Sequence, residues 1–132
     1  MQQTSGVALM SQWYLEGMYI IQQLNDICRK HDLTYDQYLV LEQIVEEKRN
    51  TPKQIADTFK TSAPASSRKI NILQRKRFIE KIHNIDGDQR TVELDLTASG
   101  RQHYEAAKKE LAVKNSQFKA ADIKQLAAIK EK

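Results

Sequence analysis

The chain has 132 residues, of which 29% are charged and 40% hydrophobic, with a formal net charge of +4; this composition indicates one folded domain and excludes a disordered chain. No apolar run approaches the roughly 20 residues that span a bilayer, and the N-terminus lacks the pattern of a secretory signal, so we expect a cytoplasmic protein. The single cysteine, Cys28, excludes an internal disulfide and a multi-cysteine zinc site.

Residues 7–30 predict a long amphipathic helix, because apolar side chains recur at spacings of three and four. The residues of this stripe are Met10, Tyr14, Met18, Ile21, Leu24 and Cys28, with Trp13, Ile20 and Ile27 beside it. The stripe is wider than the packing of one small domain normally requires. We therefore expect a partner helix.

A second helix is predicted from Thr34 to about Lys48. The Thr34 side chain can cap the free backbone N–H groups, and Gln37 three residues later completes a capping box. Leu33 and Tyr38 occupy the two positions of a hydrophobic staple.

Two shorter helices follow, and a tight turn separates them. Thr51 and Gln54 form a second capping box at the start of the third helix. Ser62 caps the fourth helix, which we expect from about Ala63 to Lys76. Two short helices joined by a turn of three or four residues are typical of a helix-turn-helix.

The fourth predicted helix has an unusual composition, since no Asp or Glu occurs from Ser62 to Phe78. A plain surface helix would be expected to pair its basic side chains with acidic ones one turn away. Small hydroxyl side chains near its start would let the backbone approach phosphates. The pattern favours close approach to DNA.

Two short strands are predicted after this helix, at 78–82 and 92–96, with a long polar loop between them. Thr97 caps a fifth helix, and a sixth is expected from about Asp122. The chain is therefore mainly helical with one small hairpin.

The basic residues are concentrated in the middle of the chain. Residues 48–90 hold 11 Lys and Arg but 4 Asp and Glu, a surplus of +7, whereas the remainder has a balance of −3. This distribution favours a surface that binds a polyanion, although a solvated lysine-rich surface would have the same balance. On charge alone both interpretations stay open.

Three stretches of the chain show a more specific pattern. The stretch from Asp88-Gln89-Arg90 to Leu96-Thr97 and Gly100 contains a D-x-R wing signature followed by an L-T-x-x-G helix start. LTYDQYLVLEQI and ILQRKRFIEK are the second and third stretches. Over nearly its whole length the sequence resembles the MarR family of bacterial winged helix-turn-helix transcriptional regulators.

Two positions depart from the family pattern. Arg77 stands where the family commonly has a glycine between the recognition helix and the wing, a place where left-handed backbone is easiest. Gln89 stands where the wing often has a second arginine.

The resemblance implies a winged helix-turn-helix flanked by N- and C-terminal dimerisation helices, with residues 1–132 forming a single domain. Residues 34–96 would be the DNA-binding lobe, and residues 7–30 and 97–132 would form the dimer. The implied function is that of a sequence-specific, homodimeric regulator of transcription. We expect a repressor that binds a pseudo-palindromic double-stranded operator and is released by a small-molecule or oxidant effector.

The expected DNA contacts combine the resemblance with side-chain chemistry. Arg90 would enter the minor groove, and Asp88 would brace its guanidinium group. Ser66 could also face the core, and Lys53 and Gln54 could serve only as a solvated lysine and a cap. The full candidate set is Lys53, Gln54, Ser62, Pro64, Ser66, Ser67, Arg68, Asn71, Arg75, Asp88 and Arg90.

The resemblance also implies a pocket for a phenolic or lipophilic effector. Its candidates are Trp13, Tyr14, Tyr19, His31 and Tyr38, although aromatic residues at helical spacing more often belong to a core or dimer interface. Cys28 could sense oxidants, but its place on the apolar stripe favours a buried structural thiol.

Catalytic and metal-binding signatures are absent from the sequence. The three histidines are scattered, the glycines form no phosphate loop, and no nucleophile motif occurs, so we expect neither an enzyme nor a cofactor. Two other classes stay open, a winged-helix protein-interaction module and a non-specific architectural DNA-binding protein.

Overall fold

The computed structural model describes residues 6–86 and 89–114, with the side chains of residues 83–91 outside this description. Within these residues the chain forms five α-helices and one antiparallel pair of β-strands. In chain order they are α1 (Gly6–Arg29), α2 (Tyr35–Val45), α3 (Pro52–Phe59), α4 (Ala63–Arg75), β1 (Ile79–Asp86), β2 (Gln89–Leu96) and α5 (Ala98–Lys114). This architecture confirms the predicted winged helix-turn-helix. The sixth helix expected from Asp122 lies outside the described residues.

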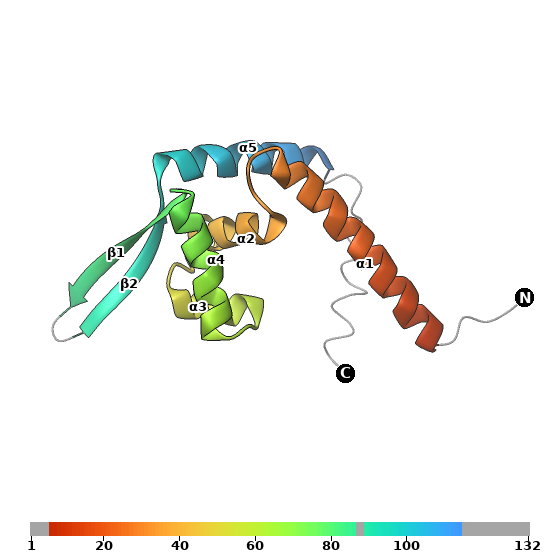
Figure 1. Ribbon diagram of the computed structural model, residues 1–132, viewed down its shortest axis with the longest axis horizontal. Helices are drawn as coiled ribbons and strands as arrows, with labels where there is room; N and C mark the ends of the chain where they lie inside the picture. Colours follow the sequence, from red (N-terminus) through yellow and green to blue (C-terminus); the bar gives the residue numbers. More distant parts are fainter. Residues whose placement is uncertain (1–5, 87–88, 115–132) are drawn as a thin grey trace, which may run out of the picture.

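The elements form an arch (Figure 1). Helix α5 lies across the top, α1 descends from one end of it, and α2, α3, α4 and the two strands occupy the other side. The N-terminal part of α1 extends away from the rest of the protein. In the described ranges no helix is both long enough and apolar enough to cross a membrane.

Both predicted capping boxes are confirmed. Thr34 Oγ1 accepts a hydrogen bond from the Gln37 backbone N–H at 3.1 Å, and Gln37 Oε1 accepts one from the Thr34 N–H at 3.0 Å. The same reciprocal pair joins Thr51 and Gln54 at 3.2 Å in both directions. These bonds satisfy N–H groups that a helix start otherwise leaves free.

The prediction that the second helix reaches Lys48 is wrong, because α2 ends at Val45. Lys48 has a positive φ of 57°, and the Arg49 backbone N–H donates to the Gln43 carbonyl at 2.9 Å. The left-handed Lys48 thus turns the chain back onto a carbonyl of α2 and ends the helix.

The prediction of a long loop between the two strands is also wrong. The strands pair continuously from Ile79 opposite Leu96 to Asp86 opposite Gln89, so only positions 87 and 88 separate the last pair. Residues 83–86 and 89–91 are mostly polar and lack apolar alternation, and it is backbone pairing that extends the hairpin there.

The core lies where α2, α4, α5 and the base of the hairpin meet. At its centre the Tyr104 ring stacks on Tyr38 with ring centroids 5.2 Å apart, and Tyr38 stacks on Tyr35 at 5.7 Å. The Tyr104 hydroxyl donates to Glu46 Oε2 at 2.6 Å, which satisfies its polar end. The fully buried Leu41, Ile55, Ile70, Leu73 and Leu94 belong to the same core cluster. The core thus fixes α4 and the hairpin to α2 and α5.

A compact junction fastens the start of α5 to the turn between α4 and β1; we call it the α4–α5 junction and define it by Arg77, Phe78, Thr97 and Gly100. Thr97 caps α5 by accepting from the Gly100 N–H at 3.0 Å, and its hydroxyl donates to the Arg77 carbonyl at 2.6 Å. The Thr97 N–H donates to the Phe78 carbonyl at 3.0 Å. Gly100 packs directly on the backbone of Phe78, since an added Cβ would lie 2.8 Å from the Phe78 Cα.

Candidate nucleic-acid interface

Helices α3 and α4 form the predicted helix-turn-helix. Lys60 ends α3 in a left-handed conformation with φ 51°, and Ser62 Oγ accepts from the Ala65 N–H at 3.2 Å to start α4. Ile70 and Leu73 bury the inner face of α4. Its outer face carries exposed polar side chains, which are Ser67, Arg68, Asn71, Gln74 and Arg75.

Ser66 does not belong to this outer face, and its assignment to DNA contact is wrong. It is 1% exposed, and its hydroxyl donates to the Pro52 carbonyl at 3.3 Å. The hydroxyl therefore ties α4 to the start of α3, as the core-facing alternative predicted.

The basic residues of α4 and its C-cap residue Lys76 fall into two groups. Lys69 Nζ contacts Asp36 Oδ2 at 2.6 Å and lies 5.1 Å from the centre of the Phe59 ring. Lys76 Nζ donates to the Asp32 carbonyl at 2.8 Å and to Gln37 Oε1 at 3.0 Å. Both lysines thus hold α4 against neighbouring parts of the lobe.

The two arginines of α4 behave differently from its lysines. Among the residues that the structure describes, the Arg68 and Arg75 side chains have no hydrogen-bond or ion-pair partner, and both are exposed. Their charge is available to an outside anion. This division of the basic side chains into paired lysines and unpaired arginines could not be predicted from the sequence, because it depends on which side of α4 faces α2.

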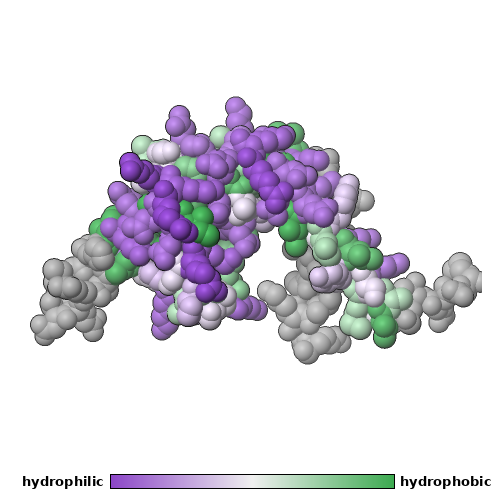
Figure 2. Space-filling model, in the orientation of Figure 1, coloured by the Kyte–Doolittle hydropathy of each residue, from purple (hydrophilic) through white to green (hydrophobic). Residues whose placement is uncertain are grey.

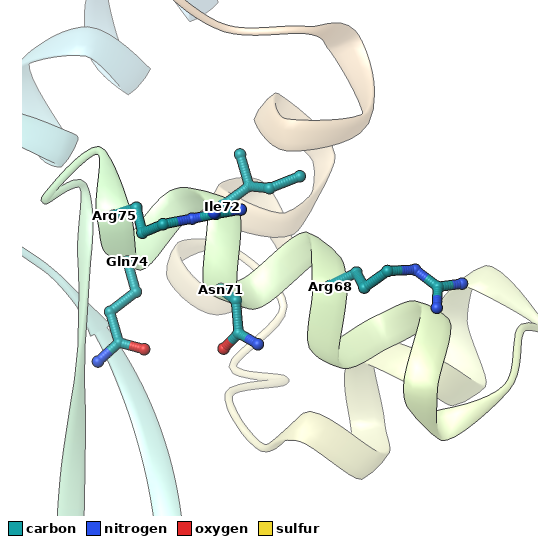
Figure 3. A pocket seen from close by; sticks show the side chains of 5 residues that line it. All are labelled: Arg68, Asn71, Ile72, Gln74 and Arg75. Carbon is teal, nitrogen blue, oxygen red and sulfur yellow. The ribbon is translucent and has the colours of Figure 1, made fainter.

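A shallow concavity of about 640 Å³ lies on the outer face of α4 (Figure 3). Its lining residues are Arg68, Asn71, Ile72, Gln74 and Arg75. Gln74 was missing from the residues predicted from the sequence. Its position three residues after Asn71, on the same side of a helix, was the signal that could have identified it.

The remaining candidates of the helix-turn-helix lie at helix starts. Lys53, Ser62 and Pro64 are exposed, at the beginnings of α3 and α4. Gln54 is half-buried, and its side-chain carbonyl accepts from two backbone N–H groups, of Asn50 and Thr51. Gln54 therefore acts as a cap through its side-chain oxygen, and this role does not use its amide nitrogen.

The two candidates of the wing cannot be placed in the same way. Asp88 lies outside the described residues, as does the side chain of Arg90. The backbone of Arg90 pairs opposite Ile85, one position from the last pair of the hairpin. Their contact with DNA stays a prediction.

The five candidates for effector binding do not converge on one pocket. Tyr14 and Tyr19 are exposed on α1, at 69% and 62%, and Trp13 is half-buried. Tyr38 is buried within the tyrosine stack of the core, which favours the core alternative over a role in ligand binding.

His31 lines a concavity beside the start of the loop after α1. This concavity has a volume of about 330 Å³, and it lies between the end of α1 and α5, lined by Lys30, His31, Asp32, Gln102, His103 and Ala106. His31 Nε2 and Lys30 Nζ each contact the Glu110 carboxylate at 2.9 Å. These two partners lower the pKa of Glu110.

Cys28 is fully buried, as predicted for a structural thiol. Burial raises the pKa of the thiol from 9.0 to about 11, and the negative charge of Glu110 adds to the shift. A thiol with such a pKa is almost entirely protonated at neutral pH, and only the thiolate reacts readily with oxidants.

The comparison with known proteins agrees with this geometry. A model described as the MarR family matches residues 31–90, which include α2, α3, α4 and β1. A search of curated proteins gives no significant match.

Several solved structures share the fold of nearly the whole chain. The DNA complex of S. aureus MepR has 19% identity and a TM-score of 0.73, and the match covers 97% of this chain and 93% of MepR. Sco5413, a MarR family transcriptional regulator from Streptomyces coelicolor, has 15% identity and a TM-score of 0.75, with coverage of 93% and 88%. YusO of Bacillus subtilis has 23% identity and a TM-score of 0.58, with coverage of 96% and 95%. Residues 31–90 thus match the MarR family model, and the solved structures share the fold of nearly the whole chain.

Proposed function

We propose that the chain is a sequence-specific, double-stranded-DNA-binding transcriptional regulator that acts as a homodimeric repressor. The observation that carries this proposal is the outer face of α4. It presents Arg68 and Arg75 without partners in the described structure, and the helix has no carboxylate to neutralise them. Unpaired guanidinium groups on an exposed helix favour a polyanion that accepts an α-helix in a groove.

The shape of the lobe supports the same proposal. MepR, which shares the fold at a TM-score of 0.73, was solved with DNA bound. An α-helix fits a major groove about 12 Å wide, and the adjacent hairpin would then lie along the flanking minor groove. Lys53, Ser62, Pro64 and Ser67 would be positioned beside the phosphates.

A homodimer would supply the partner for α1. The first part of this helix exposes a run of large apolar side chains, which are Val7, Leu9, Met10, Tyr14, Leu15, Met18, Tyr19 and Ile21. Figure 2 shows hydrophobic residues along α1, whereas the face of the lobe beside it is largely hydrophilic. Apolar area of this extent is characteristic of an interface. Two lobes would then meet two halves of a pseudo-palindromic operator.

Of the two kinds of effector expected, the buried Cys28 favours a small molecule over an oxidant. A small-molecule effector would act by changing the spacing of the two DNA-binding lobes.

The decisive experiment is titration of fragments of the chain's own promoter region and of genomic DNA at several salt concentrations. We expect tight binding to particular fragments and a steep loss of affinity with rising salt, because bound phosphates release counterions. If the protein binds none of the fragments at low salt, the proposal is refuted.

A pair of variants tests whether the partner-free arginines carry the contact. Arg68→Ala is expected to weaken DNA binding and to lower the salt slope by about one. Lys69→Ala removes the same charge one residue away, from a side chain already paired with Asp36. It is expected to leave the affinity much closer to that of the unmodified protein.

The same titration separates the alternative functions. A non-specific architectural protein would bind all fragments equally, and a protein-interaction module would bind none.

A further inference from the structure

Two uncharged amide side chains, Asn71 and Gln74, lie together on the outer face of α4. Both are exposed, and within the described residues neither has a hydrogen-bond partner. Figure 3 shows them projecting to the same side of the helix, whereas Arg68 and Arg75 extend along it. The two amides therefore form one edge of the concavity, distinct from the two guanidinium groups.

The chemistry of an amide differs from that of a guanidinium group. A carboxamide carries a donor and an acceptor side by side, and an adenine presents the complementary pair, N7 and the N6 amino group, in the major groove. A guanine presents two acceptors there, which suit arginine instead. Because an amide has no charge, it adds little to the attraction of phosphates.

The spacing of the two amides matches DNA. Three residues of α-helix rise about 4.5 Å, which lies between one and two base-pair steps of about 3.4 Å. Two amides on one edge can thus reach neighbouring base pairs.

The two arginines are placed to contact the phosphates. Arg68 and Arg75 are seven residues apart, about 10 Å along the helix, so they flank the two amides on a helix that follows the groove. The lysines of α4 are held by Asp36, Asp32 and Gln37 and do not compete for this role.

We propose that Asn71 and Gln74 read adenines at two neighbouring base pairs in each operator half-site, while Arg68 and Arg75 hold the flanking phosphates. This inference rests on the proposed function, since it names the sequence class that the DNA-binding face selects. Asn71 and Gln74 supply sequence discrimination, and the arginines supply affinity.

The test is selection of bound DNA from a random pool with four full-length proteins: the unmodified chain, Asn71→Ala, Gln74→Ala and Arg68→Ala. The recovered sites of the unmodified chain are expected to contain adjacent A·T pairs in each half-site. Asn71→Ala should lose the preference at one of these pairs and Gln74→Ala at its neighbour, each by roughly 5- to 150-fold.

Two controls accompany the selection: the Arg68→Ala variant, and a check that each variant is folded. Arg68→Ala should retain the preferred sequence and bind all DNA more weakly. Both amides are exposed and unpaired, so unchanged circular dichroism and thermal midpoints are expected for their variants.

Two results would overturn the inference in different ways. If the unmodified chain selects a sequence whose base preferences survive both amide substitutions, or if these remove preference at G·C pairs, the assignment of the amides is wrong and the proposed function stands. If the unmodified chain selects no sequence, the proposed function itself fails and this inference fails with it.

Discussion

Arg77 adopts a backbone conformation that glycine would adopt at lower cost. Its φ of 63° lies in the left-handed region, where an L side chain costs roughly 1–2 kcal/mol. The MarR family commonly has glycine at this position, where left-handed backbone is easiest. The structure thus locates a specific strain at the α4–α5 junction.

Arg77→Gly is therefore expected to raise the free energy of unfolding by about 0.5–1 kcal/mol, once the greater chain entropy of glycine is subtracted. Urea denaturation measures the change. Arg101→Gly, the same substitution within α5, should instead destabilise by about 1 kcal/mol. A loss of stability in Arg77→Gly equal to that of the control would show that the arginine is not strained.

Cys28 is expected to be unreactive in the folded protein. With a pKa raised to about 11, only about one thiol in a thousand is ionised at pH 8, and the side chain is fully buried. A thiol reagent should label Cys28 only at the rate at which the protein unfolds, and rapidly in urea. Fast labelling of the folded protein would restore the oxidant-sensor interpretation.

The same shift predicts how stability depends on alkaline pH. The folded pKa lies above the value of 9.0 for an unperturbed thiol, so the stabilising contribution is complete below pH 9 and is lost as the pH rises through 11. The fall in unfolding free energy between pH 9 and pH 11 should be smaller in Cys28→Ala. An equal fall in both proteins would assign the alkaline loss to other groups.

At the scale of elements, the start of α5 depends on close backbone contact at Gly100. A Cβ there would overlap the Phe78 carbonyl group, and backbone atoms cannot move aside as a flexible side chain can. Gly17 lies in the middle of α1, and a Cβ added to it would have nothing within 4 Å. The two helical glycines thus predict opposite effects of one substitution.

Gly100→Ala is expected to destabilise the protein by about 1–3 kcal/mol or more, because it overpacks the junction. Gly17→Ala should stabilise it by about 0.5–1 kcal/mol, because alanine favours a helix interior. Thermal and urea unfolding of the two variants compare these effects directly. Similar stability of Gly100→Ala and the unmodified protein would mean that the junction can open at little cost.

The elements differ in how far the sequence predicts them. Helix starts at Thr34, Thr51 and Ser62 were predictable because capping is local chemistry between residues three apart. The end of α2 and the outer half of the hairpin were not, because a left-handed Lys48 and a polar paired strand leave no periodic signal. The candidate site shows the same difference between features set by local sequence and features set by tertiary contacts. The exposed face of α4 was predictable from its period, whereas the pairing of Lys69 and Lys76 depends on tertiary contact with α2 and the turn before it.

At the scale of the whole molecule, no other described part of the arch covers the exposed apolar residues of α1 (Figure 2). If two copies pair through this face, charges placed on it should separate them. Tyr14 and Met18 both belong to the predicted stripe, and both are exposed.

The double variant Tyr14→Lys/Met18→Lys is expected to sediment as a monomer and the unmodified protein as a dimer, because lysine at a buried apolar contact must be desolvated. Gln12→Lys/Glu16→Lys adds at least as much positive charge at exposed polar positions of α1 on the side away from Met18, and it should retain the dimer. A monomeric unmodified protein would remove the basis for two-fold operator recognition.

The α4–α5 junction couples the orientation of the hairpin to that of α5. Thr97 and Gly100 bind the first turn of α5 to the backbone of Arg77 and Phe78, where β1 begins, so a tilt of α5 turns the hairpin with it. Each strand has eight residues and a length of about 26 Å. A tilt of about 10° moves the far end by about 4–5 Å, more than one base-pair step of about 3.4 Å. A small rotation of α5 together with the hairpin would thus change the position of the hairpin end by more than one base-pair step.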